Sequence, residues 1–164
     1  MDEAEKALKE AERLLNTRPS SFLGFFSMPG SGPDYHEAAE KYTIAGNLFK
    51  SVGEWQRAGS AYLRASECCE REELPEEAAR KKMTAAGCFR KAPGLAEEAI
   101  NLFTDANSVY IRSGRFAMVG ANEKEMADIC ERDLHDLERA ADYYGKAAER
   151  YLAENSPAYP FYCN

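Results

Sequence analysis

The stretch from Tyr35 to Cys69 constrains the fold more than any other part of the sequence. It contains two segments, separated at Ser51-Val52-Gly53, in which small and aromatic residues recur every three or four positions. The recurring residues are Ala38, Ala39, Tyr42, Ala45, Gly46 and Phe49, then Trp55, Ala58, Gly59, Tyr62, Ala65 and Cys69. Because an α-helix has about 3.6 residues per turn, each set lies on one helix face. The stretch is therefore predicted to form a helical hairpin.

The same pattern recurs along the chain about every twenty residues, so that a hairpin repeats about every forty. Its positions are marked by Ala39, Ala58, Ala79, Ala99 and Ala140. A period of this size is typical of helical solenoids, in which each hairpin buries its apolar face on its neighbours. Trp55-x-x-Ala58-Gly59-x-x-Tyr62 matches the start of the tetratricopeptide pattern, although its later positions do not follow. We predict an all-α, tetratricopeptide-like right-handed solenoid of antiparallel helix hairpins.

About seven helices are expected. Their predicted ranges are 2–16, 34–52, 54–71, 74–91, 95–112, 115–132 and 136–154. Gly53, Pro93-Gly94 and Ser113-Gly114 interrupt the pattern and predict turns, because glycine favours the end of a helix and proline cannot continue one. Asp34 with Glu37 three residues later resembles a capping box.

Composition excludes several classes of function. The chain has 164 residues, enough for one domain with a real core, and its net charge of −7 argues against a nucleic-acid binder. No apolar run approaches the ~20 residues needed to span a bilayer. The N-terminal residues are acidic, whereas a signal peptide begins with a basic region. The five cysteines form no C-x-x-C pair and are interpreted as reduced thiols of a cytoplasmic protein.

The sequence contains no recognisable catalytic constellation. It has no phosphate-binding glycine loop, G-x-S-x-G or H-E-x-x-H motif. His36 and His135 are more simply interpreted as surface or capping residues than as catalytic ones. We therefore expect no enzyme activity, cofactor or metal, and binding becomes the default function of such an array.

The segment from Pro19 to Pro33 is the first candidate binding feature. Its three prolines, three glycines and four serines predict a loop, and it carries a cluster of large apolar side chains. These are Phe22, Leu23, Phe25, Phe26 and Met28. Burying one such side chain is worth about 1.5–3 kcal/mol, so the cluster could attach reversibly to a bilayer surface. Alternatively, these side chains fold back onto the first helix beside Leu14 and Leu15.

The second candidate is a set of basic residues at helix ends and turns. It comprises Lys50, Arg57, Arg64, Arg90, Lys91, Arg112 and Arg115. If alternate hairpins bring them to one side, they form a basic stripe that binds an acidic partner and weakens with salt. For any single residue, the simpler interpretation is a solvating charge that interacts with the helix dipole.

An ordered series of segments resembles one known family. It runs from M-D-E-A-E-K-A-L and A-E-R-L-L through S-F-L-G-F-F-S-M, Y-H-E-A-A-E-K-Y-T-I-A-G-N-L-F-K and E-W-Q-R-A-G-S-A-Y, then E-E-A-I-N-L-F-T-D-A, S-G-R-F and D-L-E-R-A-A-D-Y-Y-G-K-A-A-E-R-Y. The series resembles the soluble NSF attachment proteins (SNAPs) of the alpha/beta type, whose hallmark is the Phe-Phe loop. The resemblance covers residues 1–156.

The resemblance implies an adaptor in intracellular membrane fusion and ER-Golgi transport, peripherally bound to membranes. Such proteins wrap a SNARE four-helix bundle, touch the membrane with the Phe loop and recruit the NSF ATPase. Phe22, Leu23, Phe25 and Phe26 match the membrane loop, and Arg115 matches a basic position facing the SNAREs. A further family lysine falls at or beside Ala121, so this contact is either lost or displaced to Lys124. The candidate SNARE-binding residues are Lys50, Arg57, Arg90, Lys91, Arg112 and Arg115.

The resemblance stops near Ser156, and residues 157–164 are predicted to be a tail outside the family. Family members continue for several more helices to an acidic end that engages NSF. The sequence therefore predicts a chain truncated to its N-terminal half, with impaired NSF stimulation and an exposed apolar edge on residues 136–154 that favours self-association. The alternative is a general tetratricopeptide-like scaffold that never touches lipid.

Overall fold

The computed structural model describes residues 2–16 and 33–154, and the described part of the chain contains seven α-helices and no strand. They are α1 (Asp2–Leu15), α2 (Tyr35–Ser51), α3 (Trp55–Arg71), α4 (Pro75–Phe89), α5 (Ala96–Arg112), α6 (Phe116–Arg132) and α7 (Leu137–Glu154). The predicted all-helical solenoid of about seven helices is confirmed. The apolar residues of the predicted Phe loop, and the predicted tail, lie outside the described residues.

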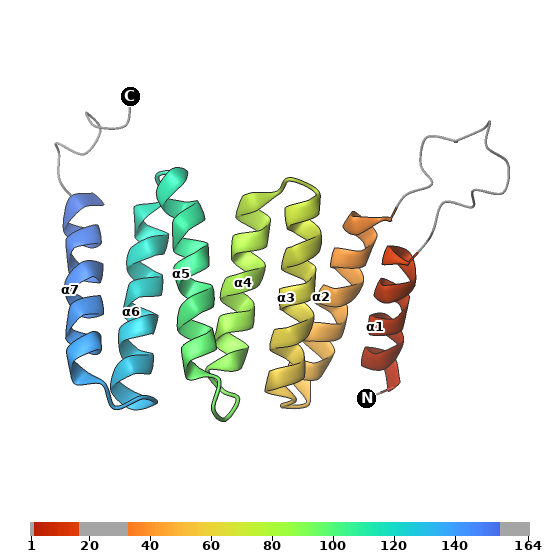
Figure 1. Ribbon diagram of the computed structural model, residues 1–164, viewed down its shortest axis with the longest axis horizontal. Coiled ribbons are helices and arrows are strands. Elements are labelled where there is room, and N and C mark those ends of the chain that lie inside the picture. The colour runs from red at the N-terminus through yellow and green to blue at the C-terminus, as the bar shows by residue number, and fades with distance from the viewer. Residues whose placement is uncertain (1, 17–32, 155–164) are drawn as a thin grey trace, which may run out of the picture.

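The helices stand side by side in one row, and each runs antiparallel to the next (Figure 1). α1 and α7 lie at opposite ends of this row. The turns after α2, α4 and α6 lie at one end of the helices, at the bottom of Figure 1, whereas those after α3 and α5 lie at the other. Side chains from every second turn can therefore meet.

A continuous core runs through the row, as expected if each hairpin buries its face on the next. The largest buried cluster contains residues from all seven helices, among them Ala7 of α1, Phe49 of α2 and Ala140 of α7. Most of the small and aromatic residues that define the sequence pattern are buried: Tyr42, Phe49 and Tyr110 are at most 1% exposed, whereas Trp55 is only partly buried. The α2–α3 hairpin is built as its spacing predicts.

Three of the turns end in glycines that the sequence marks as breaks. Gly53, Gly94 and Gly114 have φ angles of +79°, +78° and +70°, a region that glycine adopts without steric cost. The two remaining tight turns place Glu73 at φ 58° and His135 at φ 56°. No glycine signals these two turns, so the sequence could not predict their geometry.

Two leucines of α7 are mostly exposed, Leu137 at 69% and Leu152 at 73%. Tyr144 is 36% exposed, but it lies toward α6, where its hydroxyl donates hydrogen bonds to Asp128 and Glu131. On the side toward α6, Ala140 and Ala147 are buried. These exposed side chains form an apolar patch on α7, at one end of the row. The self-association expected from such a patch stays a prediction.

Candidate binding groove

Three of the predicted basic residues meet at the end of the helices where the turns after α2 and α4 lie. Lys50 is in the last turn of α2, Arg90 follows the last residue of α4, and Lys91 comes next. They line a hollow of about 650 Å³ together with Trp55, Thr84, Gly87, Cys88, Glu125 and Asp133. The hollow therefore combines side chains from α2, α3, α4 and α6.

A second hollow of about 430 Å³ adjoins the first. The two share Arg90, Lys91 and Asp133, and the second extends along the α4–α5 turn to Arg132 and Glu97. We call the combined feature the basic groove. Its cationic side chains are Lys50, Arg90, Lys91 and Arg132.

The three acidic side chains of the basic groove are already engaged by arginines. Glu125 and Asp133 lie 2.7 and 3.4 Å from guanidinium nitrogens of Arg90. Glu97 accepts two hydrogen bonds from Arg139, at 2.7 and 3.0 Å, which hold the pKa of its carboxyl below the usual value. None of these carboxylates is left to neutralise the other cations of the groove.

Lys50, Lys91 and Arg132 remain available to a ligand. All three are exposed, and none forms an ion pair with any other described residue. The Lys91 ammonium lies 4.4 Å from the centre of the Trp55 ring, a cation–π contact that places the charge over an apolar surface. The groove thus offers three positive charges without an ion-pair partner, and two of them, Lys50 and Lys91, line the same hollow as the partly buried Trp55 indole.

The buried thiol beneath the groove has no catalytic character. Burial raises the pKa of the Cys88 thiol, so this group stays protonated at neutral pH. Among the described residues no group of His, Cys, Asp and Glu side chains could hold a metal ion. The geometry supports binding of a partner through charge and apolar contact.

The other predicted basic residues do not join the groove. Arg57 pairs with Glu5 of α1 and lies 4.1 Å from the centre of the Phe49 ring, and Arg64 pairs with Glu67 at 2.7 Å. Arg112 and Arg115 flank the α5–α6 turn, at the opposite end of the helices. The Arg115 guanidinium lies 2.8 Å from Glu76. Arg112 and Arg115 therefore lie apart from the groove, and only Lys50, Arg90 and Lys91 of the six candidates line it. SNARE binding by any of the six stays a prediction.

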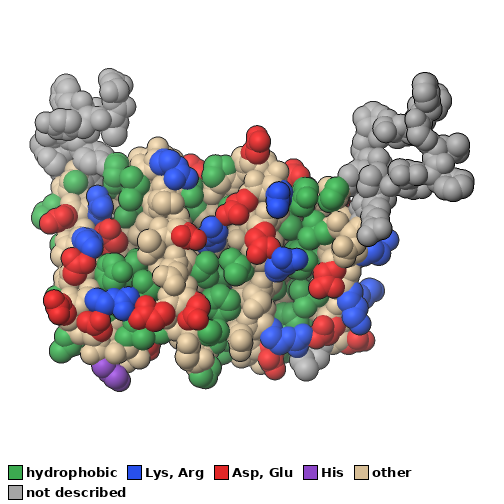
Figure 2. Space-filling view, viewed as in Figure 1, with side chains coloured by type: hydrophobic (Ala, Val, Ile, Leu, Met, Phe, Trp, Pro, Cys, Tyr) green, Lys and Arg blue, Asp and Glu red, His purple; other side chains and the backbone are tan. Residues whose placement is uncertain are grey.

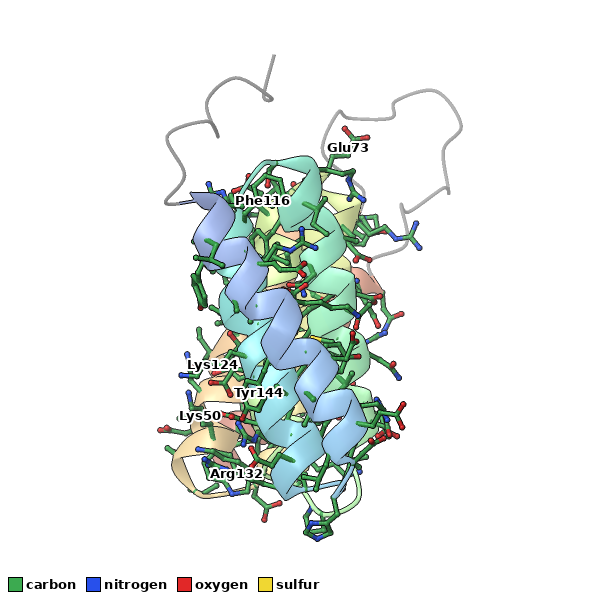
Figure 3. All side chains as sticks on the ribbon, turned by 90° about the vertical axis from the view of Figure 1, so that its left-hand side faces the viewer. Lys50, Glu73, Phe116, Lys124, Arg132 and Tyr144 are labelled. Atoms are coloured by element: carbon green, nitrogen blue, oxygen red, sulfur yellow. The ribbon has the colours of Figure 1, made fainter. Side chains whose placement is uncertain are left out.

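Two further cations, Lys124 and Arg132, lie on the groove side. Neither belongs to the six candidate SNARE-binding residues. Figure 3 shows Lys50, Lys124 and Arg132 on the same side of the row. Arg132 could have been found, because it follows Lys91 by about forty residues, as Lys91 follows Lys50, and this spacing is the repeat period. Lys124 has no such periodic counterpart. Asp128, which accepts a hydrogen bond from Tyr144, limits the positive surface toward α7.

None of the helices in the described part of the chain has the length and apolar character needed to cross a lipid bilayer. Of the five cysteines, the four in the described part are buried and unpaired, in agreement with their interpretation as small core residues.

Comparisons with known proteins agree with this architecture. The family model "Soluble NSF attachment protein, SNAP" matches residues 2–163. The matched range includes residues 157–163, which were predicted to belong to a tail outside the family.

Curated relatives cover most of this chain. The human alpha-soluble NSF attachment protein is 34% identical over 154 residues, 94% of this chain and 50% of its own length. The bovine beta-soluble NSF attachment protein is 31% identical over the same shares of the two chains. A vesicular-fusion protein of Komagataella phaffii is 31% identical over 160 residues, 96% of this chain and 52% of its own. The chain spans about half the length of these relatives, and it belongs to the soluble NSF attachment protein family.

Proposed function

We propose that this chain is a non-enzymatic adaptor in vesicle fusion that binds a SNARE four-helix bundle through the basic groove. The proposal rests on family membership and on the names of the relatives, which speak of NSF attachment and vesicular fusion. The observation that carries it is the set of three cations of the groove that have no ion-pair partner, two of which line a hollow together with Trp55. An acidic helical bundle complements such a surface, and complementary charge increases both the association rate and the specificity.

The proposal includes a contact with the membrane. Phe22, Leu23, Phe25, Phe26 and Met28 supply large apolar side chains in a segment without helical periodicity. Insertion of several such side chains into the interface gives reversible attachment, and it leaves the helical row at the membrane surface. We propose that the adaptor is a cytoplasmic, peripheral membrane protein.

The contact with an NSF-type ATPase is a separate part of the proposal. The chain spans about half the length of its relatives. We propose that these 164 residues by themselves capture SNARE bundles while recruiting and stimulating NSF poorly.

A pull-down with an assembled SNARE bundle, followed by addition of NSF, tests both statements. We expect salt-sensitive capture of the bundle, because exposed charges are screened as ionic strength rises. We expect little NSF in the captured complex and little stimulation of ATP hydrolysis. Failure to capture the bundle would refute the adaptor function, and strong stimulation would refute the predicted loss of NSF contact.

The second candidate function is a scaffold that binds a peptide or helix without membrane contact, which the basic groove alone would support. Liposome flotation of the wild type against Phe25→Ser/Phe26→Ser separates the two. The membrane function predicts that the variant loses most of its flotation, whereas equal flotation of the two proteins favours the scaffold.

A further inference from the structure

Arg90 differs from the other cations of the basic groove because its charge is already engaged within the protein. Its guanidinium lies 2.7 Å from Glu125 and 3.4 Å from Asp133, and its side chain is 22% exposed. The other three cations of the groove are exposed and form no ion pair with a described residue. Two nearby carboxylates offset the single charge of Arg90, so this residue adds little to the attraction of an acidic partner.

The ion pairs of Arg90 join two helices that are not neighbours in the row. Glu125 lies within α6 and Asp133 directly follows it, whereas Arg90 directly follows α4. α5 separates these two helices (Figure 1). The planar guanidinium presents several N–H donors in fixed directions, so one arginine engages two carboxylates at once. Arg90 therefore ties the end of α4 to α6 across the intervening helix.

Other polar contacts also hold α6. Arg115, which directly precedes α6, lies 2.8 Å from Glu76 in the first turn of α4, at the opposite end of the helices. Between α5 and α6, the buried Asn122 side chain donates a hydrogen bond to Asn107 at 2.7 Å. The position of α6 thus depends on directional polar contacts as well as on apolar packing, and the Arg90 tie is located at the groove.

The corresponding joint one repeat earlier has no such tie. Lys50 precedes Arg90, and Thr84 precedes Glu125, by about forty residues, which is the repeat period. Lys50 and Thr84 line the same hollow, so a hydroxyl stands at the joint where the next repeat has a carboxylate. Among the described residues no ion pair joins α2 to α4. The chain therefore leaves the cation free at the first joint and engages it at the second.

We infer that Arg90 is a positioning residue of the basic groove and that it acts through α6 instead of contacting the ligand. By holding α6 against the end of α4, it sets the separation between Lys91 and Arg132, which line the same hollow. The inference rests on the docking proposed above, and it adds which contact keeps the docking surface in shape. A surface that is already held in its binding geometry loses less conformational entropy on association and binds more tightly.

The variant Glu125→Gln/Asp133→Asn tests the inference, because it breaks the tie and leaves every cation in place. If Arg90 were a ligand contact, this variant would bind an assembled SNARE bundle more tightly, since the groove loses two negative charges and the guanidinium is freed. The positioning role predicts weaker binding. If the untied α6 keeps the groove geometry for about a tenth of the time, the affinity measured by titration calorimetry falls about tenfold.

The matched control is Glu98→Gln/Glu138→Gln, which removes the same charge. These two carboxylates lie in the first turns of α5 and α7, at the same end of the helices as the groove, and neither forms an ion pair with a described residue. Electrostatics alone predicts that the control binds the bundle as tightly as the wild type or slightly more tightly. Circular dichroism should show both variants folded, and the test variant alone should lose affinity.

Hydrogen exchange of the free protein provides a second measurement that does not involve the bundle. Loss of the tie should speed exchange of the backbone amides in the last turns of α6 by on the order of tenfold, while exchange in α2 and α3 stays unchanged. Unchanged exchange in α6, an increase spread over all helices, or bundle binding by the test variant that equals or exceeds that of the control would overturn the inference. A wild type that captures no bundle would refute the proposed function, and the exchange measurement would still decide whether Arg90 holds α6.

Discussion

Gly59→Ala should lower the stability of the protein by roughly 1–3 kcal/mol, although alanine is the better helix former. A Cβ atom at this position would lie 2.4 and 2.5 Å from two ring carbons of Phe89. Phe89 is only 8% exposed and packs in the core cluster that joins α3 to α4. The ring or the helix must therefore move, and a close-packed interior opposes both movements. Thermal unfolding should shift down by about 2–4 °C per kcal/mol.

Gly87→Ala provides the matched control, because the same methyl group would meet no heavy atom within 4 Å at that position of α4. It should raise stability by about 0.5–1 kcal/mol, the usual gain for replacing glycine inside a helix. Gly59→Ala/Phe89→Leu should recover part of the loss by making room. Equal and small effects of the two alanine substitutions would show that α3 and α4 do not approach as closely as described.

Lys50→Glu/Lys91→Glu should reduce the affinity for an assembled SNARE bundle by on the order of 100-fold. The change replaces two of the three unpaired cations of the groove with anions, and the new carboxylates would add to Glu125 and Asp133. An acidic bundle would then meet like charges, each of which costs binding free energy. Titration calorimetry at two salt concentrations should also show a smaller salt dependence for the variant.

Lys6→Glu/Lys9→Glu is the control for this experiment, since it makes the same change of charge on α1, away from the groove. In solution, without vesicles, it should bind the bundle like the wild type. Arg115→Glu should have a smaller effect than the groove variant, because Arg115 lies at the other end of the helices and pairs with Glu76. Similar losses in all three variants would contradict a localised docking site.

The helices could be predicted from the sequence because their core positions follow a simple period. Their observed ends lie within two residues of the predicted ones. Asp34 accepts a hydrogen bond from the Glu37 backbone N–H at 2.9 Å, as a cap should. The turns at Glu73 and His135 fall between predicted helices, but their left-handed backbone conformation was not predicted, because residues other than glycine in that region leave no clear signal. Figure 2 shows acidic and basic side chains mixed over the visible face of the row.

The groove could be predicted only in part. Sequence spacing places Lys50 and Lys91 near helix ends, but it does not show which charges are neutralised. The pairs that decide this join distant residues, 52 positions apart for Arg57 with Glu5 and 35 for Arg90 with Glu125. Such contacts depend on how the helices pack, so the free cations became identifiable only in the three-dimensional arrangement.

The central claim is that the SNARE bundle docks on the basic groove, and lysine footprinting tests it most directly. The full chain would be acetylated with and without an assembled bundle, and the modified lysines quantified by mass spectrometry. We predict that Lys50 and Lys91, both exposed in the free protein, become protected in the complex, while Lys6 and Lys9 of α1 stay reactive. Unchanged reactivity of Lys50 and Lys91 in a demonstrably formed complex would contradict the account.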